Sequence, residues 1–93
     1  HVSAVDGLVA GLADDFWQVR QKCLNALGKL KAQPAARQIA ALLASDMPSL
    51  RKEAAAALGE IADPATRDAL MGHISDADPD VRKTVRWALT RIG

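Results

Sequence analysis

Three arginines recur at one interval along the chain, and their side chains are the first candidates for chemistry. Their positions differ by 31 residues each time: Arg20, Arg51 and Arg82. A guanidinium presents a planar fork of donors that suits carboxylates, so a ladder of such groups could grip an acidic partner. An aspartate also lies five or six residues before each arginine, at Asp14, Asp46 and Asp76. Because these residues could satisfy the forks within the chain, we favour a structural role for the ladder.

The other reactive side chains do not form a catalytic pattern. Cys23, the only cysteine, falls on an apolar stripe, which favours a small packed thiol over a nucleophile. His73 fits a half-exposed helix residue better than a metal ligand, since His1 is the only other imidazole. The aspartates gather in polar turns, where helix capping and pairing with arginine account for them. We therefore predict no catalytic residue, no cofactor and no metal site.

The same interval governs the helices that must position these residues. Apolar residues fall at i, i+4, i+7, i+8 and i+11, which is one stripe of a helix and not a strand pattern. This pattern predicts three helices, called A, within residues 19–30, 50–61 and 81–92. Shorter patterns predict a second set, called B, within residues 4–12, 35–43 and 65–74. Polar turns with short capping side chains precede the A helices, and Gln33-Pro34 and Asp63-Pro64 separate A from B.

The predicted fold is an all-α solenoid of about three helical hairpins, with six helices in the order B-A-B-A-B-A. One hairpin cannot bury both of its apolar stripes, whereas stacked hairpins share a continuous core. We expect a single repeat domain over residues 1–93, with a half unit at 2–13, units at about 14–44 and 45–75, and a terminal half unit at 76–93. Half units would expose apolar surface, so we expect capping, self-association through the ends, or excision from a longer array.

Glycines in the first two A helices mark where neighbouring helices approach one another. Gly28 and Gly59 each cost a helix about 1 kcal/mol relative to Ala, which a close contact would justify. Thr90 stands at the equivalent position of the third A helix. Because threonine gives no such allowance, we expect this unit to lie at or near the C-terminal end of the array.

Composition argues against several classes of function. The net charge is +1, from 12 basic and 11 acidic residues spread along most of the chain, so no general attraction to polyanions follows. The longest apolar run, residues 39–44, is far shorter than the roughly 20 residues of a membrane-spanning helix. We expect a cytoplasmic protein without a membrane partner, and we consider nucleic acid an unfavoured binding partner.

The repeated segments resemble HEAT-like repeats, of the short type found in phycobilisome lyases. The resemblance rests on Val19-Arg20, Leu50-Arg51 and Val81-Arg82, each followed by an Ala-Leu pair and preceded by aspartate-containing turns. It implies that each arginine pairs with turn aspartates of its own or the adjacent unit. It also implies an inner binding surface on the B helices, formed by Asp6, Arg37, Gln38, Arg67, Asp68 and His73. Iron-binding HEAT-repeat enzymes use His-Glu pairs, and neither histidine here precedes a glutamate.

Two further places are candidates for partner binding. Phe16 and Trp17 replace turn residues of the other units, and they either plug a helix junction or anchor a partner. The last A helix carries Arg82, Lys83, Arg86 and Arg91 together with Trp87, which indicates either a solubilising cap or a binding edge.

We predict that the chain is a non-catalytic scaffold or regulatory module that binds another protein. One alternative, from the resemblance alone, is a subunit of a lyase-type complex acting on a tetrapyrrole-bearing protein. Another is binding of a nucleic-acid backbone through the basic last helix, which would weaken steeply with salt.

Overall fold

Six α-helices make up most of the computed structural model, which describes residues 3–93. Their bounds are α1 (Ala4–Gly11), α2 (Trp17–Lys29), α3 (Ala36–Ala41), α4 (Pro48–Ile61), α5 (Arg67–Met71) and α6 (Pro79–Ile92). No strand occurs within residues 3–93, so the predicted all-α class is confirmed. Residues 1 and 2, which include the start of the predicted half unit 2–13, lie outside the described residues.

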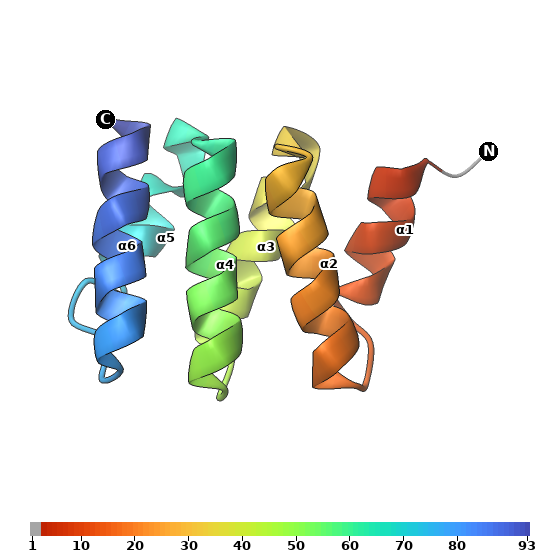
Figure 1. Ribbon diagram of the computed structural model, residues 1–93. Helices are drawn as coiled ribbons and strands as arrows, with labels where there is room; N and C mark the ends of the chain where they lie inside the picture. The colour runs from red at the N-terminus through yellow and green to blue at the C-terminus, as the bar shows by residue number, and fades with distance from the viewer. Residues whose placement is uncertain (1–2) are drawn as a thin grey trace.

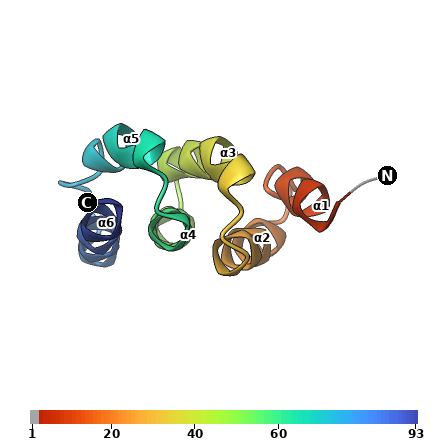
Figure 2. The same ribbon diagram turned by 90° about the horizontal axis from the view of Figure 1, so that it is seen from above.

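The helices form two rows that run from one end of the molecule to the other. The A helices α2, α4 and α6 stand side by side in Figure 1. Seen from above in Figure 2, they form one row, and α1, α3 and α5 form the second. The body measures 39 × 27 × 17 Å, so it is longer than it is thick. This arrangement confirms the predicted α-solenoid.

A single apolar seam lies between the two rows. Its largest side chains come from every helix except α1 and are at most 2% exposed: Leu24, Leu27, Ile39, Leu43, Leu50, Leu58, Leu70, Val81 and Val85. Cys23 joins them at 8% exposure, as expected for a packed thiol. Burial raises the pKa of the Cys23 thiol, and the Asp14 charge adds to this effect. The thiol is therefore held in its unreactive, protonated form.

The glycines of α2 and α4 lie where the next A helix approaches most closely. A Cβ atom at Gly28 would lie 2.9 Å from the Cα atom of Ala57 in α4. At Gly59 it would overlap the Trp87 ring and lie 3.1 Å from the Cα atom of Ala88 in α6. These contacts confirm the predicted close approach, and they show which faces of α2 and α4 meet the following helix.

The B helices are shorter and less regular than their apolar patterns predict. Tight 3-10 turns flank α3 at Gln33–Ala35 and Leu42–Ala44, and another precedes α5 at Pro64–Thr66. Pro34 and Pro64 lack an NH group and lie in the first residues of the turns that precede α3 and α5, where a full α-helical turn does not form. Ile74 was expected on the buried stripe of its B helix, which was wrong. The helix α5 ends before it, at Met71, and Ile74 is 39% exposed.

The polar turns before the A helices share one local structure. The side chains at the first turn position each accept a hydrogen bond from the NH two residues later: Asp14 from Phe16 at 2.9 Å, Ser45 from Met47 at 3.2 Å, and Asp76 from Asp78 at 2.9 Å. These side chains were expected to accept hydrogen bonds from the first NH groups of the helices, but they accept from the NH of the N-cap residue instead. Only Asp78, at the start of α6, caps helical NH groups of an A helix with its side chain.

The close approach at Gly28 can be tested against an exposed glycine. Replacing Gly28 with Ala should lower the midpoint of thermal unfolding, because the overpacking cost of about 1–3 kcal/mol exceeds the helix-propensity gain of about 1 kcal/mol. Replacing Gly7 with Ala should raise the midpoint, since a Cβ there would meet no atom within 4 Å beyond its chain neighbours and the backbone of its own helix. Far-UV circular dichroism during heating measures both. Equal stabilisation by the two substitutions would contradict this packing.

Candidate functional site

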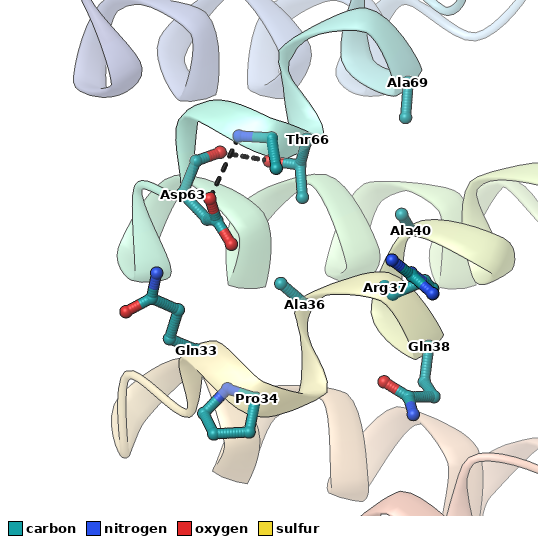
Figure 3. A pocket seen from close by; sticks show the side chains of 10 residues that line it. Gln33, Pro34, Ala36, Arg37, Gln38, Ala40, Asp63, Thr66 and Ala69 are labelled. Carbon is teal, nitrogen blue, oxygen red and sulfur yellow. Dashed lines mark hydrogen bonds between the residues drawn. The ribbon is translucent and has the colours of Figure 1, made fainter.

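A groove of about 510 Å³ opens between the two B-helix segments that follow α2 and α4. Figure 3 shows Gln33, Arg37 and Gln38 on one side, with Asp63 and Thr66 on the other. Alanines account for most of the remaining lining, at Ala36, Ala40, Ala65 and Ala69. Because alanine side chains are short, the space between the two segments stays open.

Hydrogen bonds hold the Asp63 side of the groove rigid. The Asp63 Oδ1 atom accepts from the NH of Ala65 at 3.0 Å, and the Thr66 hydroxyl donates to the Asp63 carbonyl at 2.8 Å. Thr66 is only 5% exposed, so this bond satisfies a buried hydroxyl. The second Asp63 oxygen accepts no hydrogen bond within residues 3–93 and remains available.

The groove gathers only two of the six residues expected on the inner surface, Arg37 and Gln38. Arg67 and Asp68 are exposed at the start of α5 but do not line it. Asp6 completes the capping box of α1 with Ser3. His73 lies beyond the end of α5, in the turn that leads to α6.

The three repeating arginines each clamp the turn that precedes their own helix. One Nη1 atom binds two backbone carbonyls in every case: Arg20 binds Asp14 and Asp15 at 2.6 and 3.4 Å, Arg51 binds Ser45 and Asp46 at 3.0 and 3.3 Å, and Arg82 binds Asp76 and Ala77 at 2.7 and 3.2 Å. The turns of all three units are therefore closed by the same contact. Carbonyl oxygens, rather than the carboxylates of Asp14 and Asp46, accept these bonds.

Arg51 alone also reaches a carboxylate, and that carboxylate belongs to the next unit. Its Nε and Nη2 atoms donate to the two Asp76 oxygens at 3.0 Å each, with side-chain exposures of 16% and 6%. His73 Nδ1 lies 3.2 Å from the same carboxylate. Arg20 has no such partner because Ser45 stands where Asp76 stands one unit later. Its fork thus lacks the carboxylate that the resemblance implied.

The pKa of Asp76 reflects these contacts. Hydrogen bonds from Arg51 hold the pKa of the carboxyl far below its ordinary value of 3.8, and bonds from the Asp78 NH and from His73 act in the same direction. Burial opposes them but is outweighed. The pKa of Arg51 is raised, chiefly by its hydrogen bonds to Asp76. Both groups are therefore charged in the folded chain at neutral pH.

The aromatic and basic candidates lie apart from the groove. Phe16 is 70% exposed and Trp17 is 38% exposed at the start of α2. Trp87, 40% exposed, packs on Gly59, and the Arg91 guanidinium lies 5.8 Å from the centre of its ring. A shallow cleft of about 340 Å³ beside Trp87 includes Lys52, which the sequence did not single out. Lys52 lies 31 residues before Lys83, and this repeat of a lysine at equivalent positions could have drawn attention to it in the sequence.

Neither a metal centre nor a membrane span is evident in the part of the chain that the structure describes. No group of three or more His, Cys, Asp or Glu side chains in residues 3–93 is placed to hold a metal ion. His73 faces Asp76, which is already engaged by Arg51. Among the helices of the same range, none is long and apolar enough to cross a bilayer.

Replacing Asp76 with Asn should lower the free energy of unfolding at neutral pH by about 2 kcal/mol, because charged hydrogen bonds are lost in a buried setting. In the unfolded chain this carboxyl takes up a proton at a higher pH than in the folded chain. Its stabilising contribution is therefore complete above 3.8 and declines as the pH falls below that value. The difference between the two proteins should shrink towards about pH 3 in urea titrations.

An exposed aspartate of an equivalent turn provides the control. Asp15 has no side-chain hydrogen bond within residues 3–93, so its replacement by Asn should change stability by less than about 0.5 kcal/mol. A difference between wild type and the Asp76 variant that stays constant with pH would show that ionisation of Asp76 is not the source of the stability.

Two proteins of known activity are similar to this chain. Deoxyhypusine hydroxylase of Bos taurus is 42% identical over 65 residues, which cover 68% of this chain and 22% of that protein. The structure of human deoxyhypusine hydroxylase in complex with glycerol matches with a TM-score of 0.88 and 36% identity, over 96% of this chain and 32% of the human chain. This chain therefore spans less than a third of the length of either relative.

These similarities correct the functional prediction. A non-catalytic scaffold was expected because no catalytic residue could be identified, yet both relatives are named as enzymes at 36–42% identity. The expectation that the chain is not an enzyme is contradicted by the same relatives. The prediction failed because it rested on the absence of a catalytic pattern among Cys23, His73 and the turn aspartates, and such an absence does not identify a function.

A family model described as HEAT repeats matches residues 5–90. The match covers the turns with Asp14 and Asp76, all three clamping arginines and the close helix contacts at both glycines. It supports HEAT-like repeats in general and does not distinguish the lyase-type subtype. On this match, together with the two-row solenoid, the chain belongs to the HEAT-repeat family.

Proposed function

We propose that this chain is a repeat segment of a deoxyhypusine hydroxylase-type enzyme, and that its part is to bind and orient a polypeptide along the groove between α3 and α5. The observation that carries the enzyme context is the structural match to the human hydroxylase, at a TM-score of 0.88 and 36% identity over 96% of this chain. The match to the bovine hydroxylase, at 42% identity over 65 residues, is a match of sequence and supports the same context.

The assignment of binding, and not of a chemical step, follows from the side chains of the segment. Residues 3–93 offer no set of donors for a metal ion, and Cys23 is buried as a protonated thiol. Accessible polar groups line the groove instead. We therefore derive no reaction step from these residues.

The groove has the groups that an extended polypeptide requires. Backbone NH and carbonyl groups of a bound segment need both acceptors and donors, and the amides of Gln33 and Gln38 supply both. The second oxygen of Asp63 offers a negative acceptor, and Arg37 offers a positive donor on the other side. The alanine lining leaves room for side chains of the bound segment between these polar groups.

A chimera tests this function. Residues 3–93 would replace the matching segment of human deoxyhypusine hydroxylase, and mass spectrometry would detect the oxygen atom added to a deoxyhypusine-containing protein. We expect the chimera to retain activity. Replacing Ala69 with Trp should lower kcat/KM by about tenfold, mainly through KM, because the indole ring fills an exposed part of the groove.

Ala41 provides the matched control, because it is an exposed alanine of α3 that does not line the groove. Its replacement by Trp should leave both kcat and KM unchanged. A chimera that melts cooperatively yet adds no oxygen would contradict the enzyme context. Equal effects of the two tryptophan substitutions would contradict the role of the groove.

A further inference from the structure

The outer face of α6 differs in character from the equivalent faces of α2 and α4. Leu24 in α2 and Ala55 in α4 are fully buried, and Gly28 and Gly59 on the same faces contact the next A helix. The equivalent residues of α6 are Arg86 and Thr90, and both are exposed. Residues four positions apart share one face of a helix, so arginine and threonine define the face of α6 turned away from α4.

Arg82 stands beside this face with part of its guanidinium open. Its Nη1 atom clamps the turn before α6, as the equivalent atoms of Arg20 and Arg51 clamp theirs. The Nε and Nη2 atoms of Arg51 also grip the Asp76 carboxylate, whereas those of Arg82 have no hydrogen-bond partner within residues 3–93. The turn therefore holds Arg82 in the same orientation as Arg51, which binds both carboxylate oxygens of Asp76.

We propose that Arg82 and Arg86 form a carboxylate-binding site on the outer face of α6, and that its ligand is an acidic segment of a partner polypeptide. The fork of Arg82 takes one carboxylate as Arg51 takes Asp76, and Arg86 takes a second carboxylate on the same face. Lys83 adds positive charge next to Arg82. The half-buried Leu89 and Ile92 supply an apolar contact for a neighbouring side chain of the partner.

The same face is unsuited to a further repeat of the kind inside this chain. A Cβ at Gly28 would already lie 2.9 Å from the backbone of Ala57, and Thr90 presents a larger branched side chain at the equivalent position. Arg86 would also bring a charge into a position where Leu24 and Ala55 are 0% exposed. Burial of an unpaired charge is strongly unfavourable, so the partner must bring carboxylates.

The Arg51–Asp76 pair and the net charge of the chain both favour carboxylates over phosphates as ligands of this site. The ligand that this fork takes inside the molecule is an aspartate, held by two hydrogen bonds of 3.0 Å. Nucleic-acid binding draws on many cations spread over a surface, whereas the net charge here is only +1. This proposal does not depend on the proposed function, because the α6 face and the α3–α5 groove share no residue.

Fluorescence anisotropy with a labelled peptide, in which glutamates flank a leucine, tests the site on the full chain. A peptide with glutamine at each glutamate position is the reference, and a single-stranded oligonucleotide of equal charge tests the alternative ligand class. We expect Arg86→Ala to weaken binding of the glutamate peptide by about tenfold. Arg67→Ala, which removes an exposed arginine of α5 that lines neither the groove nor the α6 face, should leave binding unchanged.

Each result decides the proposal. Binding of the glutamate peptide that depends on Arg86 and exceeds that of both reference ligands supports it. Absence of glutamate-peptide binding, equal binding of the glutamine peptide, equal loss in the Arg67 variant, or tighter binding of the oligonucleotide would each overturn it. Arg86 is exposed and makes no hydrogen bond within residues 3–93, so its replacement tests the site without opening the turn that Arg82 clamps.

Discussion

The second and third units of this solenoid are joined by one guanidinium, which closes the turn before its own helix and reaches the turn before the next A helix. Arg51 holds two carbonyls of its own turn and both oxygens of Asp76, which lies 25 positions later. Apolar burial stabilises the stack but is tolerant of small shifts between helices. The paired hydrogen bonds add direction, and they fix how far α4 and α6 are displaced along the solenoid. The position of the α6 face relative to α4 depends on that displacement.

The repeat interval was enough to predict the helices, the solenoid and the buried thiol of Cys23, because all three follow from which side chains recur on one face. It was also enough to predict the close approach at Gly28, where only the absence of a side chain explains a poor helix former. The partners of the arginines could not be predicted in the same way. Ser45 and Asp76 occupy equivalent positions, and only the geometry between units shows that the second supplies a carboxylate to Arg51.

The groove was harder to predict because it depends on the lack of large side chains on two separate segments. Nothing in the sequence distinguishes Ala36 and Ala69 from the other alanines of the predicted helices, and only the structure shows that both line the space between α3 and α5. The enzyme context was missed for a related reason. Cys23, His73 and the turn aspartates form no catalytic pattern, so the enzyme context comes only from the similarity to the two hydroxylases.

A double-mutant cycle on Arg51 and Asp76 tests the central claim most directly. The free energy of unfolding would be measured for the wild type, for each alanine variant and for the double variant. If the pair joins the two units, the effects will be non-additive by at least about 1 kcal/mol, because the second substitution removes a group that has already lost its partner. Additivity within about 0.3 kcal/mol would contradict the claim and leave apolar packing alone to hold the units in place.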